Sequence, residues 1–333
     1  MIKNKYINLR QIMRARIRFA LLFSALLFTS VYAQNVQYPT RPIRVIIPVA
    51  PGGNVDSVMR LISAKMSEGL GQSVVLDNKP GASTNIGNEL VAKAPADGYT
   101  LLANTIPLVA NISLYPKLSY DPEKDFVPIS MMVSSPSMIA VSANLPVKNL
   151  QELIIFAKKN PGMIKYSTSG AGGITHLAVE LLAFQTNTKF AHIPYKGGGP
   201  ALMALMSGEV DLSVLSVLSA AGQMNSQRIK VLAVTSPKRL PMYPDIPSVS
   251  EFVPGYEFNS WVGLVAPKGT PPSVIQMLNE QVSRALRSTE VMDKIQKDGG
   301  DVIASTSDQF KKSITLEVAL WAKVIQQAGI TPD

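Results

Sequence analysis

Four short segments combine glycine with small hydroxyl and amide residues, which are the residue types that bind small anions through backbone N–H groups. They read "PVAPGGNVD" (48–56), "KPGASTNIG" (79–87), "STSGAGGITH" (167–176) and "PYKGGGPAL" (194–202). Each follows an apolar, strand-like run and precedes the start of a predicted helix. In open α/β sheets such turns gather at the carboxyl ends of the strands, where ligands bind. The glycines of any one segment are explained more simply by a tight turn. Four such segments together predict a common anion-binding cleft.

The same segments argue against a nucleotide site and against catalysis. The stretch from Gly170 to Thr175 reads G-x-G-x-x-T, so it lacks the third glycine of the dinucleotide fingerprint, and the chain has no GxxxxGK[ST] motif. It also has no G-x-S-x-G elbow and no H-E-x-x-H pair. We therefore predict a binding protein and not an enzyme.

Four side chains near the turns could contact a ligand or have a structural role, and for two of them both interpretations stay open. His176, in the first turn of a predicted helix, either contacts the ligand or only supports the turn. Lys196 either neutralises a bound carboxylate or is solvated. His192 lies within an apolar strand and is predicted to be a core histidine. Asp56 is predicted to be a stabilising acid at a helix start and not a base.

The N-terminal segment is predicted to be a secretory signal peptide, residues 1–33. Residues 1–18 hold six basic side chains and no acid, 19–28 are apolar, and Val31-Tyr-Ala33 offers a cleavage site after Ala33. The apolar run is too short for a membrane-spanning helix, which needs about 20 residues. Removing these six charges lowers the formal net charge from +9 to 9 − 6 = +3 for residues 34–333, so we expect no nucleic-acid partner.

The complete absence of cysteine excludes disulfides, zinc–thiolate sites and a lipid-modified cysteine anchor. An exported, unanchored protein of this kind is predicted to reside in the bacterial periplasm.

The remaining 300 residues alternate apolar runs with amphipathic segments, which is typical of α/β layers with largely parallel sheets. We expect two αβ lobes, one formed by residues 34–137 plus 259–333 and the other by 138–258. Well-marked helices are expected from 149 to 157 and from 308 to 328. The expected strands are 43–50, 73–77, 100–103, 138–141, 164–166, 190–193, 211–215, 228–234 and 261–266.

The turns, in this order, resemble those of a known family. "YPTRPIRVIIPVAPGGNVDSVMR", "NKPGASTNIG", "APADGYTLL", "TSGAGGITHLAVELL", "HIPYKGGGPALMALMSGEVD" and "LVAPKGT" are similar to segments of the Bug family, the extracytoplasmic receptors of tripartite tricarboxylate transporters. The similarity runs from about Tyr38 to the C-terminus.

The resemblance implies a two-lobed periplasmic-binding-protein (flytrap) fold, in which each lobe is a mostly parallel sheet flanked by helices. It implies a monomer that captures a small organic carboxylate in an interlobe cleft, without metal or organic cofactor, and delivers it to a tripartite tricarboxylate-type permease. The alternative is a ligand sensor that signals to a membrane partner without transport.

The resemblance and the residue types together give the candidate ligand-binding residues. They are Ala50, Gly52, Gly53, Asn54, Ser83, Thr84, Asn85, Asn104, Thr105, Ser167, Thr168, Ser169, Gly170, Gly172, His176, Tyr195, Lys196, Gly197 and Leu215.

Leu215 departs from the family pattern, because many relatives carry an aspartate at this point of the strand. An aspartate would pair with a ligand amino group, so Leu215 predicts a carboxylate without one. The alternative is that Leu215 faces the core of its lobe and does not contact the ligand.

If the signal peptide is cleaved as predicted, the exported protein begins at Gln34, because Val31 and Ala33 supply the small residues that the cleavage site needs. Mass spectrometry of the protein from the periplasmic fraction measures this directly. Recovery of the uncleaved chain from the inner membrane would contradict the prediction.

Overall fold

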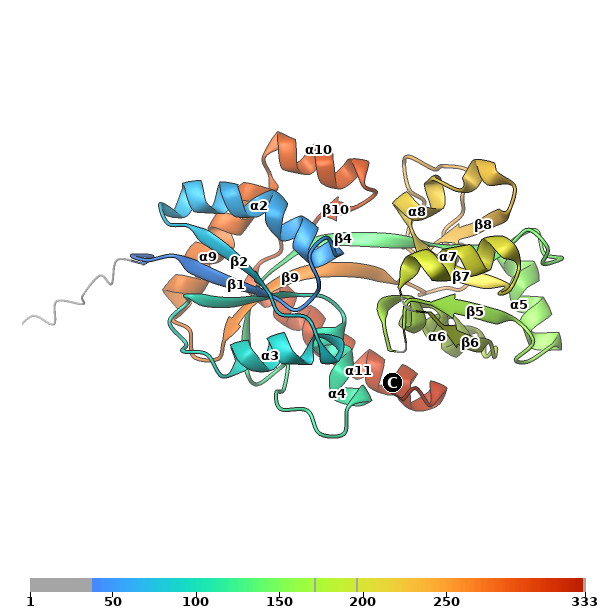
Figure 1. Cartoon of the computed structure of the whole chain (residues 1–333), viewed down its shortest axis with the longest axis horizontal. Helices are drawn as coiled ribbons and strands as arrows, with labels where there is room; N and C mark the ends of the chain where they lie inside the picture. Colours follow the sequence, from blue (N-terminus) through green and yellow to red (C-terminus); the bar gives the residue numbers. More distant parts are fainter. Residues whose placement is uncertain (1–37, 171, 196, 332–333) are drawn as a thin grey trace, which may run out of the picture. The chain divides into compact units, whose positions relative to one another are not determined.

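The computed structural model describes residues 38–170, 172–195 and 197–331 (Figure 1). The chain divides into two compact units, Met1–Tyr38 and Pro39–Asp333, and all of the elements below belong to the second unit. The predicted signal peptide and its cleavage site lie outside the described residues.

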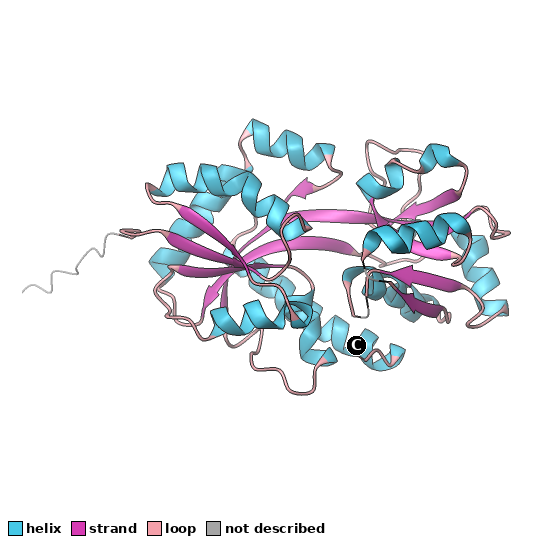
Figure 2. Cartoon of the chain, viewed as in Figure 1, coloured by secondary structure: helices cyan, strands magenta, loops and turns pink. Residues whose placement is uncertain are grey.

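The first half of the unit is built on three parallel strands, in the order β2–β1–β3. These are β1 (Ile43–Ile47), β2 (Val74–Asn78) and β3 (Thr100–Asn104). Helix α2 (Asn54–Leu70) connects β1 to β2, and α3 (Asn85–Ala92) connects β2 to β3. The two helices lie on opposite faces of the strands (Figures 1 and 2), so both faces are covered.

A 17-residue strand, β4 (Phe126–Ser142), is shared by the two halves. It pairs with β9 (Asn259–Pro267) as far as Pro136, and with β7 (Leu212–Ser216) from Ser137 onward. The predicted division into lobes at 137/138 and 258/259 stays a prediction, and it falls where β4 changes partners.

The second half repeats the arrangement with the parallel order β7–β5–β6, where β5 is Lys165–Thr168 and β6 is Ala191–Pro194. Strand β8 (Ile229–Val234) pairs antiparallel with β4. Four helices accompany these strands: α5 (Leu150–Lys159), α6 (Ile174–Thr186), α7 (Gly198–Ser207) and α8 (Val217–Ala221).

The chain then returns to the first half. After β9 come α9 (Pro272–Leu286), α10 (Thr289–Lys297), the short β10 (Asp301–Val302), which pairs with β4, and α11 (Ser307–Ala328). Helix α11 contacts α4 (Pro107–Leu114) of the first half and α6 of the second. It therefore packs against both halves.

Two elements differ from the sequence-based expectation. The expected strand 138–141 is only the end of β4, which begins at Phe126 and carries Pro128 and Pro136, although proline usually argues against a paired strand. A register shift with β9 follows Pro128 and accommodates it. Helix α4 was not expected at all, because six of its eight residues are buried and it lacks an amphipathic period.

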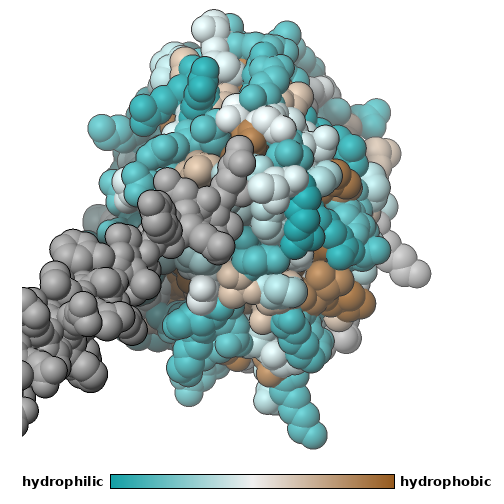
Figure 3. All heavy atoms as spheres, turned by 90° about the vertical axis from the view of Figure 1, so that its left-hand side faces the viewer, coloured by the Kyte–Doolittle hydropathy of each residue, from teal (hydrophilic) through white to brown (hydrophobic). Residues whose placement is uncertain are grey.

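The surface in Figure 3 is mainly hydrophilic, and its apolar side chains form only small groups. Among the described residues, no helix is both long enough and apolar enough to span a bilayer. Nothing on this face resembles a large apolar interface.

A partly buried glutamate joins α11 to β9. Glu317 accepts hydrogen bonds from Trp261 Nε1 at 2.7 Å and from Trp321 Nε1 at 3.4 Å. Burial raises the pKa of Glu317 to about 7; the two indole donors oppose this shift, and the nearby Glu257 charge adds to it. The folded protein therefore holds a proton on Glu317 at pH values where the unfolded chain has lost it.

This shift predicts that stability falls as the pH rises from about 4.5, the ordinary value, to about 7. At 1.36 kcal/mol per unit the loss is roughly 3 kcal/mol, and it is complete once both states are ionised. Glu317→Gln removes the titrating group, so the free energy of unfolding of this variant should fall by roughly 3 kcal/mol less than that of the wild type over the same pH range. Urea unfolding followed by far-UV circular dichroism measures both proteins, and an identical pH dependence would refute the assignment.

Candidate functional site

The predicted turns lie at the carboxyl ends of parallel strands in each half. Residues 48–53 follow β1, residues 79–84 follow β2, and Asn104 ends β3, so they share one edge of the β2–β1–β3 sheet. In the second half, Ser169, Gly170, Gly172 and Gly173 follow β5, and Tyr195 and Gly197 follow β6, again at one edge. The structure therefore brings the candidates together as two groups.

One close approach connects the second group with the first half. A Cβ added at Gly172 would lie 2.9 Å from Leu114 Cδ1, at the end of α4. Gly172 also has φ +68°, a left-handed backbone angle that L side chains rarely adopt. Both constraints explain why this position is glycine.

The turn after β1 uses its own N–H groups internally. Gly52, with φ +83°, donates its N–H to Asp56 Oδ2 at 2.8 Å, and Gly53 donates to the Ala50 carbonyl at 3.2 Å. Asn54 then begins α2 and is exposed. The first N–H groups of α2, and not those of the two glycines, are consequently the donors available to a ligand.

Asp56 carries the predicted role of a helix-start acid. It is 1% exposed, pairs with Arg60 Nε at 2.8 Å and accepts from Asn78 Nδ2 at 3.0 Å. The Arg60 hydrogen bond is the largest of the effects that lower the pKa of Asp56 to about 2. Its negative charge is therefore permanent and already compensated by Arg60.

The turn after β2 is held in an unusual conformation. Ala82, Ser83 and Thr84 all have left-handed φ values, +46°, +50° and +77°, and none of them is glycine. Such angles are unfavourable for residues with a Cβ, so the surroundings must hold them. Ala82 and Ser83 are exposed, whereas Thr84 is buried.

A buried network of asparagine side chains holds this turn through hydrogen bonds. Asn88 Nδ2 donates to Thr84 Oγ1 at 3.2 Å and to the Tyr120 hydroxyl at 2.7 Å. Asn104 Nδ2 donates to Asn88 Oδ1 at 2.5 Å, and Asn104 Oδ1 accepts from the Thr105 N–H at 2.8 Å. Asn104 and Thr105 are 1% and 4% exposed, so they brace the turn and present little surface to a ligand.

Asn111 and Tyr120 fix the orientation of Asn85. Asn111 Nδ2 donates to the Ser83 carbonyl at 2.7 Å and to Asn85 Oδ1 at 2.8 Å, and the Tyr120 hydroxyl donates to Asn85 Oδ1 at 3.0 Å. Because both donors occupy Oδ1, the amide nitrogen of Asn85 faces the other way, and no described residue accepts from it. Asn85 thus presents a fixed N–H₂ group.

The turn after β5 also uses backbone N–H groups in hydrogen bonds to nearby side chains. Ser167 and Thr168 are fully buried at the strand end, and Gly170 donates its N–H to Thr168 Oγ1 at 3.3 Å. Ser169 donates its N–H to Thr175 Oγ1 at 3.2 Å. Ser169 is exposed, so its hydroxyl is the part of this turn that a ligand could reach.

His176 supports this turn. The Gly172 N–H donates to His176 Nδ1 at 2.9 Å, and the His176 ring stacks on His192 with centroids 3.8 Å apart. His192 Nε2 in turn lies 2.6 Å from Thr168 Oγ1. His192 thus has a polar partner, but it is only partly buried and so differs from the predicted core histidine, because β6 is an edge strand.

The turn after β6 leads into α7. Gly197 (φ +106°) donates its N–H to the Tyr195 carbonyl at 2.9 Å, and the Tyr195 hydroxyl donates to Glu209 Oε1 at 2.7 Å. Gly198 and Gly199 begin α7 and are exposed. Lys196 lies outside the described residues.

Leu215 is placed in a hydrophobic core cluster with Met138, Val234 and Leu205, and is 6% exposed. Packing alone accounts for a leucine at this position, in agreement with the alternative interpretation given above. The expectation of a ligand without an amino group therefore stays a prediction without support from this side chain.

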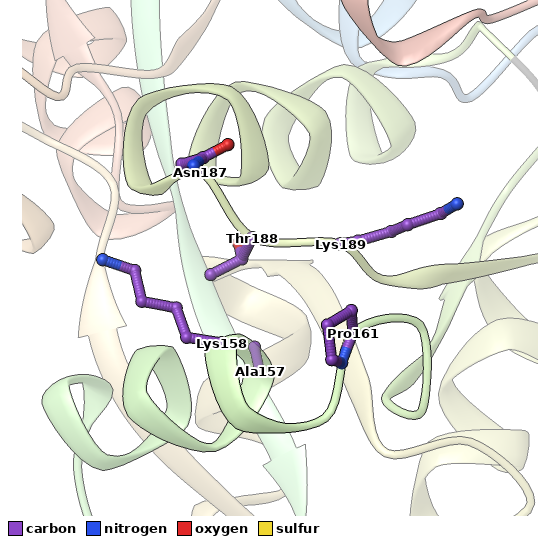
Figure 4. Close-up of a pocket in the computed structure, with 6 residues that line it drawn as sticks. All are labelled: Ala157, Lys158, Pro161, Asn187, Thr188 and Lys189. Carbon is purple, nitrogen blue, oxygen red and sulfur yellow. The ribbon is translucent and has the colours of Figure 1, made fainter.

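Figure 4 shows a separate hollow of about 390 Å³ at the C-terminal ends of α5 and α6. It is lined by Ala157, Lys158, Pro161, Asn187, Thr188 and Lys189. The Lys158 and Lys189 amines point away from each other, so they do not converge on one anion (Figure 4). We do not assign a function to it.

Sequence reasoning missed the supporting residues Asn88, Asn111, Tyr120 and Thr175. Thr175 has a local signal, because it lies in the first turn of a helix that follows glycines. The other three act across long stretches of chain, and only the fold brings them together. Among the described residues, no group of His, Asp or Glu side chains is arranged to hold a metal ion.

Residues 58–330 match the family described as "Tripartite tricarboxylate transporter family receptor". The chain is 37% identical over 304 residues to a protein encoded in the tcbD–tcbE intergenic region of Pseudomonas sp. (strain P51), with 90% of each chain covered. It is 34% identical over 295 residues to protein BugT of Bordetella pertussis, covering 88% of this chain and 90% of BugT.

Solved structures agree with this result. Rpa4515 of R. palustris, solved with adipate, has a TM-score of 0.76 and 36% identity, covering 89% of this chain and all of that one. The periplasmic binding protein BugD has a TM-score of 0.73 and 33% identity, covering 89% of this chain and 100% of BugD. MatC from Rhodopseudomonas palustris, with bound malate, has a TM-score of 0.73 and 30% identity, covering 86% of this chain and 100% of MatC.

These similarities confirm the predicted two-lobed periplasmic-binding-protein fold and the resemblance on which it was based. The chain belongs to the Bug (TctC-like) family of tripartite tricarboxylate transporter receptors, which are solute-binding receptors and not enzymes.

Proposed function

We propose that this protein is a periplasmic receptor that captures a small organic dicarboxylate between the two groups of turns and delivers it to a tripartite tricarboxylate-type permease. The observation that carries the proposal is the set of helix starts behind these turns. The first N–H groups of α2 (Asn54, Val55), α6 (Ile174, Thr175) and α7 (Gly198, Gly199) have no acceptor among the described residues.

Helix starts carry partial positive charge, which favours a bound anion without requiring a cationic side chain. The fixed N–H₂ group of Asn85 and the exposed Ser169 hydroxyl add side-chain donors at the two groups of turns. The acid nearest the first group, Asp56, is paired with Arg60 and so repels an anion little. Separate groups of donors suit a ligand with a carboxylate at each end.

The relatives support this ligand class. Adipate was bound in one related structure and malate in another, and both are small dicarboxylates. Family membership supports a role beside membrane permease subunits. Loss of dicarboxylate uptake in cells that lack this protein would test delivery, and unchanged uptake would argue against it.

A thermal-shift screen of the exported protein against mono-, di- and tricarboxylates tests capture. A ligand at 100 times its dissociation constant adds about 2.7 kcal/mol to the free energy of unfolding, so the midpoint should rise by several degrees. We expect adipate-like dicarboxylates to give the largest shifts. A screen in which no carboxylate shifts the midpoint would contradict the proposal.

The Asn85→Asp variant tests the predicted binding group. The substituted side chain keeps the oxygen that accepts from Asn111 and Tyr120 but replaces the outward N–H₂ group by a carboxylate oxygen, which repels the ligand. We expect carboxylate binding to weaken at least about tenfold, or 1.4 kcal/mol, as measured by isothermal titration.

The Asn149→Asp variant is the matched control. It makes the same change of charge at the N-cap of α5, away from the turns, where aspartate caps as well as asparagine. It should bind as the wild type does. Equal affinities for all three proteins would exclude Asn85 from the site.

A further inference from the structure

The two halves contain the same turn, built from the same spacing of residues. "GGNVD" (52–56) follows β1, and "GGITH" (172–176) follows β5. In each, the first glycine has a left-handed φ, +83° at Gly52 and +68° at Gly172. In each, the second glycine is the N-cap of the helix, with φ/ψ of −69°/165° and −75°/171°.

The internal hydrogen bonds correspond as well. The second glycine donates to the carbonyl three residues earlier, Gly53 to Ala50 and Gly173 to Gly170. The first glycine donates to the side chain four residues later, Gly52 to Asp56 at 2.8 Å and Gly172 to His176 at 2.9 Å. The two turns therefore differ mainly in the acceptor, a carboxylate in one and an imidazole in the other.

This difference has a chemical consequence. Asp56 remains an acceptor at every pH at which the protein functions, because its pKa is held at about 2. His176 Nδ1 accepts an N–H only when the imidazole is neutral and its proton is on Nε2. Protonation of the imidazole therefore removes this acceptor, whereas the carboxylate acceptor of the other turn is retained.

Three titratable groups surround the His176 ring in the described structure. His192 of β6 stacks on it, Tyr166 of β5 lies 5.9 Å away between centroids, and Glu180 of α6 approaches Nε2 at 3.9 Å. Glu180 favours the imidazolium, while the start of α6 and a protonated His192 oppose it. Whichever effect dominates, the second proton must go to Nδ1 and displaces the Gly172 N–H.

We propose that His176 is a positioning residue that holds Gly172, and with it the start of α6, in place for binding only while its imidazole is neutral, so that carboxylate affinity falls as His176 takes up a proton. This inference rests on the proposed carboxylate-binding function. It assigns the acid sensitivity of binding to the second half alone.

The first experiment requires no ligand. In ¹⁵N spectra of the ligand-free protein between pH 8 and 5.5, the Gly172 amide should shift with the same midpoint as the His176 ring nitrogens, while the Gly52 amide stays constant. The chain has only two histidines, which simplifies the assignment of the ring signals. A Gly172 amide that does not follow the His176 titration would overturn the proposal.

The second experiment measures affinity for adipate, as the probe, over the same pH range. His176→Asn is the informative variant, because its Oδ1 replaces Nδ1 at the same position along the side chain and does not titrate. The wild-type dissociation constant should rise as the imidazole takes up a proton, by about tenfold for each pH unit below the midpoint that the Gly172 amide reports. In the variant the dissociation constant should stay constant, apart from the titration of adipate itself.

A wild-type dissociation constant that stays constant, or the same rise in the variant, would overturn the coupling to binding. If adipate and other carboxylates bind at no pH, the proposed function has failed, and the amide titration still decides whether His176 controls the turn. The two failures are therefore distinguishable.

Discussion

The antiparallel pairing of β4 with β9 is the interaction on which the rest of the structure depends. Strand β4 belongs to both sheets, pairing with β9 up to Pro136 and with β7 and β8 beyond it. The parallel strands of the second half are joined to β4 through β7, and those of the first half through β9. The carboxyl ends of both sets of strands carry the turns. The positions of all candidate binding groups therefore derive from one ladder of backbone hydrogen bonds.

The second constraint is that anion-binding turns need left-handed backbone angles, which only glycine adopts easily. The chain meets it in two ways. Gly52 and Gly172 adopt such angles themselves and are fixed by a helix side chain, whereas residues 82–84 are held by buried amides. All of these turns can be recognised from their glycines in the sequence, but the distant asparagines that hold residues 82–84 cannot.

This distinction explains which parts of the fold and of the candidate site could be predicted from the sequence. The strands and turns were predictable because apolar runs and glycines are local signals, and Asp56 behaves as a helix-start acid should. Helix α4 and the N-terminal part of β4 were not, because uniform burial removes the amphipathic period and prolines obscure the strand. The asparagine network and the core position of Leu215 depend on contacts that only the fold creates.

The junction of Glu317 with Trp261 and Trp321 has a spectroscopic consequence. These are the chain's only tryptophans; Trp261 lies on β9 and Trp321 on α11. The indole emission of the protein therefore comes from the surroundings of a single carboxyl group, while residues 143–258 contribute none. Tryptophan fluorescence followed during unfolding therefore records the loss of the β9–α11 contact, and, through the edge-to-face contact of Trp321 with Phe258, the separation of α11 from the chain that precedes β9.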